Sequence, residues 1–309
     1  MMNRFTRFSF AATAATYILI FVGGLVRVSG AGLGCPDWPR CFGRWIPPTD
    51  ISQLPANIDP SQFNFALAWI EYINRLIGMS VGLLIGATAI WALFAYRKQI
   101  RVIISSGLAG LLVAYQGWQG SHIIESQLDS TIVSIHMGLA FIIAMLMMYT
   151  TQQAYYIHKQ AAATDSPVFS RLRWFVIGLA VVSMVQVVSG AMLREAIEWA
   201  ALAFPLLSDA EVLTKIGAVQ YVHTVLGIAV VLLTWKIGAH IMKSIASRKS
   251  AVGQATIGAM VTASLQLVIG PVTIMFGAPQ LMQLLHLVLS ALYMGILVLM
   301  FSGLKYAEE

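Results

Sequence analysis

Residues 65–96 read FALAWIEYINRLIGMSVGLLIGATAIWALFAY, and this stretch decides the class of fold. It carries only two charged residues, Glu71 and Arg75, and exceeds the roughly 20 mainly apolar residues that a membrane-spanning helix needs. The whole chain of 309 residues is 58% hydrophobic and 10% charged, whereas a soluble domain is about 25% charged. This composition excludes a soluble enzyme, a disordered protein and a secreted disulfide scaffold. It predicts an all-α, polytopic membrane protein.

Seven other apolar runs have the length of a membrane span, so that the chain has eight predicted transmembrane helices. These helices are predicted at Phe8–Val28, Phe65–Tyr96, Val102–Ile123, Thr131–Tyr156, Trp174–Leu193, Ile216–Ile241, Ala255–Phe276 and Gln280–Leu304.

The distribution of Lys and Arg predicts how the spans are oriented. Thirteen of these residues lie at the two termini and in the turns near 97–101, 157–173 and 242–254, against five on the opposite side. Basic residues concentrate on the cytoplasmic side, so we expect both termini in the cytoplasm and the 28–64 loop outside. Without a long Arg- and Ser-rich segment before the first span, a bacterial plasma membrane is the simpler location.

Both cysteines, Cys35 and Cys41, lie in the outer loop within the sequence Gly-Cys-Pro-Asp-Trp-Pro-Arg-Cys. They can form at most one intramolecular disulfide, which an oxidising outer compartment favours. The spacing differs from the Cys-x-x-Cys-His of covalent haem attachment. Two interpretations stay open: a staple that holds the loop, or a redox-active or partner-docking pair beside an active site.

The two halves of the chain repeat polar residues and glycines at matching positions. His136 corresponds to His286 at an offset of 150, and Asn74 corresponds to His223 at an offset of 149. The Gly-x-x-x-Arg pair near the end of span 1 recurs near the end of span 5 at an offset of 167, because the first outer loop is longer. Each repeat holds four spans, which predicts two pseudo-symmetric four-helix bundles, residues 1–160 and 161–309.

The intramembrane histidines indicate the chemistry. His136, His223, His286 and Asn74 each lie about 8–12 Å below the outer surface, at 1.5 Å per residue. Ionisable groups at such depth are costly and usually functional. His223 and His286, on two helices of one bundle, suggest the two axial ligands of a haem iron. The alternative for any single histidine is a hydrogen-bonded residue of the bundle interior.

Charged residues at the outer rim have two interpretations each. Glu71 and Arg75 share one face of span 2 and either simply pair at i, i+4 or place Glu71 where it moves protons or positions water. Arg27, Arg75 and Arg194 either mark the membrane interface or bind haem propionates through charge-assisted hydrogen bonds.

Taken together, these residues resemble the haem A synthase family. The resemblance rests on Gly-Gly-Leu-Val-Arg at 23–27, the Gly-Cys-Pro-Asp-Trp-Pro-x-Cys loop, Glu-x-x-(His/Asn)-Arg opening span 2, and single histidines opening spans 4, 6 and 8. It implies oxidation of the C8 methyl of haem O to a formyl group by successive hydroxylations, giving haem A for terminal oxidases.

The same resemblance implies a division of labour between the halves. His223 and His286 would be the axial ligands of a haem b cofactor in the C-terminal bundle, and His136 would bind the substrate haem O in the N-terminal bundle. Glu71 matches the family's catalytic acidic residue, and Cys35 and Cys41 match its cysteine pair. Without a flavin or nicotinamide motif, the reductant is external, and a haem O synthase that supplies the substrate is the expected partner.

Asn74 departs from the family pattern, because many members have histidine there and asparagine is a poor iron ligand. Either the open iron face serves oxygen chemistry, or this half is inactive. Two rival functions remain: a non-catalytic haem b cytochrome that transfers electrons, and a transporter built from parallel repeats.

Overall fold

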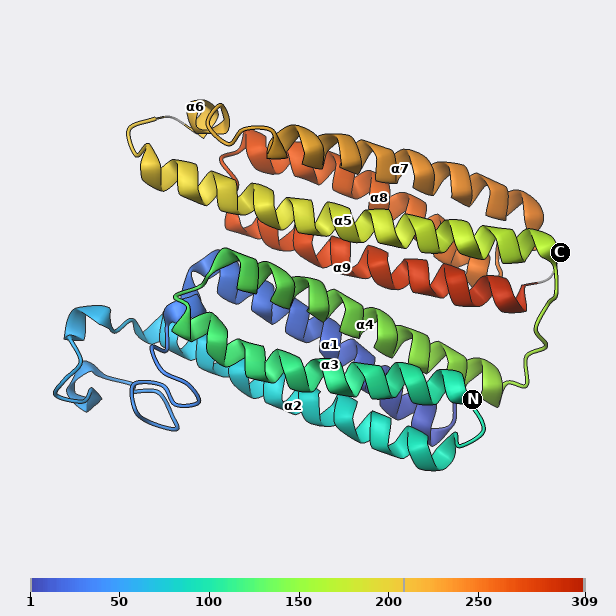
Figure 1. The fold of residues 1–309 in the computed structure, drawn as a ribbon, viewed down its shortest axis with the longest axis horizontal. Helices are drawn as coiled ribbons and strands as arrows, with labels where there is room; N and C mark the ends of the chain where they lie inside the picture. Colours follow the sequence, from blue (N-terminus) through green and yellow to red (C-terminus); the bar gives the residue numbers. More distant parts are fainter. Residues whose placement is uncertain (1, 208, 308–309) are drawn as a thin grey trace. The chain divides into compact units, whose positions relative to one another are not determined.

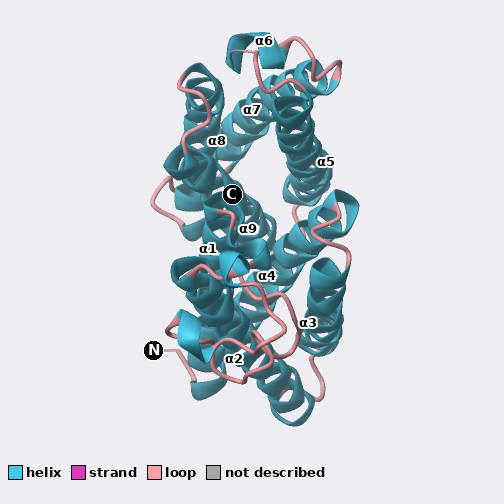
Figure 2. Cartoon of the chain, turned by 90° about the vertical axis from the view of Figure 1, so that its left-hand side faces the viewer, coloured by secondary structure: helices cyan, strands magenta, loops and turns pink. Residues whose placement is uncertain are grey.

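The computed structural model describes residues 2–207 and 209–307. In this part of the chain helices joined by loops make up the fold, with one isolated β-bridge between Cys41 and Arg44 (Figure 2). The α-helices are α1 (Arg4–Ser29), α2 (Phe65–Ala95), α3 (Ile100–Glu125), α4 (Ser130–His158), α5 (Pro167–Ala203), α6 (Asp209–Leu213), α7 (Val219–Ser244), α8 (Ala251–Met275) and α9 (Gln280–Gly303).

Eight of the described helices are long and apolar enough to cross a membrane, which confirms the predicted polytopic all-α class. The short helix α6 was not predicted, since its five residues form only part of a turn-rich connection. Helix α5 is longer than predicted at both ends and spans 37 residues. It begins at Pro167, capped by the side chain of Ser166, and continues beyond Arg194 through a more polar segment.

By backbone contacts the chain divides into two compact units. One contains the residues up to Ala154 together with Gln283–Val288, and the other contains Tyr155–Met282 together with the residues from Leu289 onward. The predicted domain boundary between residues 160 and 161 remains a prediction.

In the first unit, α1, α2, α3 and α4 lie side by side (Figure 1). Their interface is filled by a cluster of small and aliphatic side chains from all four helices: Ala12, Val81, Ile85, Ala109, Ile143 and Met147. Hydroxyl pairs join the helices at other levels, with Thr13 and Thr151 linking α1 to α4 at 3.0 Å. Small residues and interhelical hydroxyl bonds are the usual means of association where lipid removes the hydrophobic driving force.

The second unit contains α5, α7, α8 and most of α9. Polar side chains again link its helices: the Thr234 and Tyr293 hydroxyls of α7 and α9 lie 2.5 Å apart. Nε2 of Gln266 on α8 donates to Oγ of Ser290 on α9 at 2.9 Å. The guanidinium of Arg173 on α5 lies 4.4 Å from the ring centre of Phe301 on α9. These contacts join α5, α7 and α8 to α9, and α7 carries His223.

Candidate functional site

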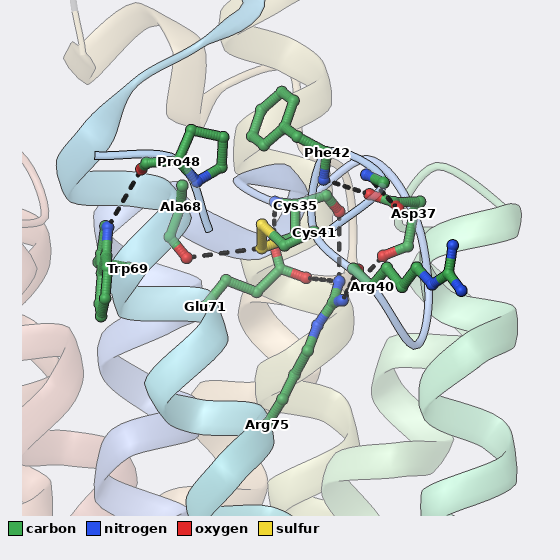
Figure 3. The surroundings of a disulfide bond; sticks show 11 residues. Cys35, Asp37, Arg40, Cys41, Phe42, Pro48, Ala68, Trp69, Glu71 and Arg75 are labelled. Atoms are coloured by element: carbon green, nitrogen blue, oxygen red, sulfur yellow. Dashed lines mark hydrogen bonds and ion pairs between the residues drawn. A yellow bond between two sulfur atoms is a disulfide. The ribbon is translucent and has the colours of Figure 1, made fainter. Parts of the chain in front are cut away.

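The loop between α1 and α2 is attached to the start of α2 through Glu71, whose residue is 4% exposed. Its Oε2 accepts a hydrogen bond of 2.7 Å from the backbone N–H of Cys35, and its Oε1 accepts one from Nη2 of Arg75 (Figure 3). The two residues also form an ion pair at i, i+4 on one helix face. Glu71 therefore joins the helix to the cysteine loop as well as to its helical neighbour.

Arg75 donates hydrogen bonds to the backbone of the loop. Its Nη1 donates to the carbonyl oxygens of Asp37 and Arg40, both at 2.8 Å, and its Nη2 donates to the carbonyl of Cys35 at 3.2 Å (Figure 3). The planar fork of a guanidinium suits several simultaneous acceptors, which a lysine ammonium does not reproduce. The loop segment 35–40 is thus wrapped around one side chain from α2.

Asp37 shapes the far side of the same loop. Its carboxylate accepts hydrogen bonds from the backbone N–H groups of Phe42 at 2.6 Å and Gly43 at 2.8 Å. Both residues have positive φ, 53° and 73°, a conformation that is costly for phenylalanine. The carboxylate stabilises this turn and brings Cys41 back toward Cys35.

Cys35 and Cys41 form a disulfide, and both are buried, at 0% and 1% exposure. They pack with Phe42 and Ala68 in a small cluster of their own. Sγ of Cys35 lies 3.5 Å from the carbonyl oxygen of Ala68 on α2, a contact rather than a hydrogen bond, because a disulfide sulfur carries no proton. Gly34 brings the loop so close to α2 that a β-carbon there would lie 2.3 Å from the carbonyl oxygen of Leu67.

The remainder of the outer loop consists of short capped turns. Asp50 and Asp59 cap the 3₁₀ helices Ile51–Gln53 and Pro60–Gln62. Hydrogen bonds from Ser52 and Ser61 lower the pKa of Asp50 and of Asp59, respectively, below the usual value for aspartate. These carboxylates are solvent-exposed and serve the loop's local structure.

His136 lies in the second turn of α4, half-buried among the helices of the first unit. Its Nδ1 is buried and has no hydrogen-bond partner. Gln116 on α3 donates through Nε2 to the backbone carbonyl of His136 at 3.0 Å, while its own Oε1 is buried and unpartnered. Asn74, in the third turn of α2, likewise has a buried Oδ1 without a partner.

His223, in the second turn of α7, has a more elaborate environment. Gln186 on α5 donates through Nε2 to the His223 carbonyl at 2.9 Å, and the same nitrogen lies 3.4 Å from the ring Nε2 of His223. Oγ of Ser189 lies 3.0 Å from Nδ1 of the ring. A β-carbon on Gly190 would lie 2.8 Å from Cε1 of the same ring.

Positions that correspond in the sequence repeat make corresponding contacts within their own halves. Asn74 Oδ1 would lie 3.9 Å from a β-carbon on Gly23, as the ring of its counterpart His223 faces Gly190. A β-carbon on Gly78 would meet Leu19 at 4.0 Å, and one on the corresponding Gly227 would meet Gln186 at 3.0 Å. Each half therefore packs its second helix against its first in the same way, which supports the repeat inferred from spacing.

The other predicted residues are placed as follows. His286 lies in the second turn of α9, within the segment Gln283–Val288 that belongs to the first unit, and is half-buried. Arg27 lies in the last turn of α1. Arg194 on α5 forms an ion pair with Glu198, with 3.0 Å between Nε and Oε1. The roles assigned to these residues, and the pairing of His223 with His286, stay predictions.

Among the described residues, His, Cys, Asp and Glu side chains form no group of three or more that could hold a bare metal ion. His136, His223 and His286 each carry an imidazole, a side chain that a haem iron takes as a protein ligand. Gln186, Ser189 and Asp37 were missed from the sequence. The signal for the first two is their spacing of three residues, directly before Gly190, on one helix face.

These features define a polytopic helical membrane protein with single histidines on its long helices. Its disulfide loop is attached to α2 by Glu71 and Arg75. The chain belongs to the COX15-CtaA family, whose description is cytochrome oxidase assembly protein, and it matches over residues 6–298.

Curated relatives named "Heme A synthase" align with much of the chain. The protein of Exiguobacterium sp. is 28% identical over 236 residues, which cover 76% of this chain and 72% of the relative. The protein of Ruegeria pomeroyi is 25% identical, covering 93% of this chain and 84% of its own length. The protein of Shewanella oneidensis is 32% identical over 143 residues, 43% of this chain and 41% of the relative.

Proposed function

We propose that the chain acts as a haem A synthase, a membrane oxidoreductase that oxidises the C8 methyl of haem O to a formyl group. The observation that carries the proposal is the pair of buried, unpartnered polar atoms in the N-terminal unit, Nδ1 of His136 and Oδ1 of Asn74. Buried polar atoms without partners are rare in native proteins and point to a missing ligand or water. In a chain of this family, a substrate haem is a ligand that fits them.

His136 is the proposed iron ligand on the substrate side, because its imidazole is the better donor of the two. Asn74 is a poor iron ligand, so His136 would be the one of these two residues that holds the substrate haem. A β-carbon on Gly23 would lie 3.9 Å from Asn74 Oδ1, so glycine keeps side-chain volume away from this oxygen. Glycine at such a place lets a flat macrocycle approach the helix.

His223 and His286 would hold the iron of a resident haem b in this proposal. When bound, this cofactor would supply one-electron redox chemistry, and the protein would orient it and tune its potential. Gly190 keeps side-chain volume away from the His223 ring, and Gly227 leaves room for the side chain of Gln186. Arg27, in the last turn of α1, and Arg194, in α5, stay candidates for binding the haem propionates.

Glu71 is the proposed group that moves a proton or positions water at the outer rim. Its carboxylate is held at both oxygens, by the Cys35 N–H and by Arg75, so its position is fixed before substrate binds. The nitrogens of Arg75 are directed to Glu71 and to loop carbonyls. In this proposal Arg75 therefore holds the loop and the acid in place.

The setting of the reaction follows from topology and composition. The excess of Lys and Arg at the termini and in the turns on the same side supports the proposed orientation, with both termini in the cytoplasm and the disulfide loop outside. A bacterial plasma membrane is the proposed location. An external donor would supply electrons. A haem O synthase is the proposed partner, because direct transfer avoids releasing an apolar haem.

The decisive experiment is haem analysis after expression together with a haem O synthase, in a host that makes no haem A. Extracted haems are separated and identified by mass spectrometry. Haem A or its hydroxymethyl precursor is expected. Its amount should be similar to that formed when an unrelated haem A synthase is expressed in place of this chain. Haem O passing unchanged through a folded, haem b-containing protein would overturn the proposal.

One observation favours a second candidate, a haem b cytochrome without catalysis. The ring of His223 is held by Gln186 and Ser189, whereas the corresponding N-terminal position is Asn74. If the N-terminal half binds no haem, the same experiment gives haem b alone and supports electron transfer as the function.

A further inference from the structure

The hydroxyl of Ser189 has a fixed direction. Its Oγ lies 2.8 Å from the backbone carbonyl of Gln186, an acceptor one turn earlier on α5. A serine hydroxyl has a single proton, and the backbone carbonyl is its nearest acceptor, ahead of Oε1 of Gln186 at 3.4 Å. With the proton on that carbonyl, the lone pairs of Oγ face Nδ1 of His223, 3.0 Å away, and Nδ1–H is the donor in that bond.

Gln186 defines the protonation state of the other ring nitrogen by the same reasoning. Its Nε2 is an amide nitrogen that can only donate, and it lies 3.4 Å from Nε2 of His223. A donor placed there requires Nε2 to carry a lone pair. The stronger bond from the same amide goes to the His223 carbonyl at 2.9 Å, so a ligand at Nε2 would displace only the longer contact.

We infer that Ser189 and Gln186 are positioning residues that hold His223 as the tautomer with the proton on Nδ1 and the lone pair on Nε2. This inference rests on the proposed role of His223 as a haem b ligand. A ligating histidine is normally oriented by a bond from its second nitrogen, which fixes the tautomer and makes the first nitrogen a better donor. Ser189 supplies that bond here.

The N-terminal repeat lacks this arrangement. At the offset of 167 that relates α1 to α5, Gln186 and Ser189 correspond to Leu19 and Val22. Leu19 occupies the same place in its own unit, against Gly78, as Gln186 does against Gly227. The C-terminal repeat therefore carries polar residues that would tune a permanently bound haem. The N-terminal repeat has apolar side chains at these positions, as suits a haem that must leave.

The reduction potential of the bound haem reports directly on this hydrogen bond. A donor bond from Nδ1–H places more electron density on the imidazole, which stabilises the ferric iron more than the ferrous iron and lowers the potential. Loss of the acceptor should raise the potential. A merely structural role for Ser189 would change haem content or yield without moving the potential in this direction.

The test compares Ser189→Val, which installs the residue of the other repeat, with Ser189→Thr, which retains a hydroxyl. Thr224→Val is the matched control, because its hydroxyl is bound to the Gln220 carbonyl of its own helix, next to His223. Each full-length protein is purified with its haem, haem b is counted per chain, and the midpoint potential is measured by redox titration. If Ser189→Val lowers the yield of folded protein, Ser189→Ala is measured in its place.

The expected result is a higher potential in Ser189→Val and a value near wild type in both Ser189→Thr and Thr224→Val. A potential in Ser189→Val or Ser189→Ala equal to that of the Thr224→Val control, with haem b still bound, would overturn this inference alone. A wild-type protein that binds no haem b, or keeps it after His223→Ala, would instead overturn the proposed function of His223.

Discussion

Gly190 of α5 and His223 of α7 are in direct contact, and a β-carbon at position 190 would lie 2.8 Å from Cε1 of the imidazole. Real β-carbons essentially never approach another heavy atom so closely. The ring therefore rests on bare helix backbone, with Ser189 beside it at 3.0 Å from Nδ1. The rotation of the imidazole is set by these two adjacent residues of α5.

Gly190→Ala should displace the His223 ring and lower haem b occupancy. Overpacking of this kind costs about 1–3 kcal/mol, which corresponds to a loss of affinity of roughly fivefold to 150-fold. The measurement is haem b per purified chain. Gly178→Ala on the same helix is the control, because a β-carbon there has nothing within 4 Å, and it should bind haem as wild type does.

Replacing the histidines singly should separate the two haem sites. His223→Ala and His286→Ala should each remove the haem b absorption, because each removes one of two proposed axial ligands. His136→Ala should retain haem b and lose bound haem O. Absorption spectra and extracted haems are measured for each variant. Unchanged haem b in both C-terminal variants would show that neither histidine is a ligand.

Glu71→Gln should abolish haem A formation and leave haem b in place. The change also disturbs the loop, because an amide nitrogen must then face either the Cys35 N–H or Arg75, both donors. To distinguish an effect on the loop from an effect on the reaction, haem A formation by Glu71→Gln is compared with that by Arg75→Lys under conditions in which the loop is equally accessible in both variants. Equal residual activity in the two variants would mean that Glu71 serves the loop only.

Arg75→Lys should loosen the loop while keeping the positive charge. An ammonium cannot reproduce the bonds that the guanidinium makes to the carbonyls of Cys35, Asp37 and Arg40. Removing one partner of a buried ion pair costs about 3–5 kcal/mol, and the lysine should cost less, because charge remains. Hydrogen exchange of the 35–43 backbone should become faster than in wild type.

Reduction of the disulfide should open the loop to trypsin after Arg40 and Arg44. The cysteines are six positions apart in the sequence, and loop-closure entropy over such a length corresponds to about 2 kcal/mol. Cleavage of a transiently open segment follows its population, so cleavage should rise by about tenfold or more. The Arg40→Gln/Arg44→Gln double variant should resist trypsin after reduction, which identifies the cleaved bonds.

Much of the fold could be predicted because the membrane makes hydropathy decisive. The eight spans follow from apolar length, and the repeat follows from matched polar residues such as His136 and His286. Helix α5 was cut short at Leu193 in the prediction because Arg194, Glu195 and Glu198 follow. In the structure the helix continues to Ala203, with Arg194 and Glu198 paired at i, i+4.

The loop was only partly predictable. The i, i+4 pairing of Glu71 and Arg75 follows from helix geometry and is observed. The bonds from Arg75 to loop carbonyls could not be predicted, since backbone acceptors have no signature in the sequence. Ser189 and Gln186 were overlooked because they are neutral, have no counterpart in the first repeat, and become significant only beside His223.

The approach of Gly34 to α2 has a genetic consequence. A side chain at position 34 would collide with the backbone of Leu67 and Ala68, and backbone is common to every residue type. Substitution at position 67 or 68 therefore cannot restore a Gly34 variant. Second-site suppressors are expected instead within the loop, where the chain can shift away from the helix, and their positions would mark which loop segments are free to move without loss of activity.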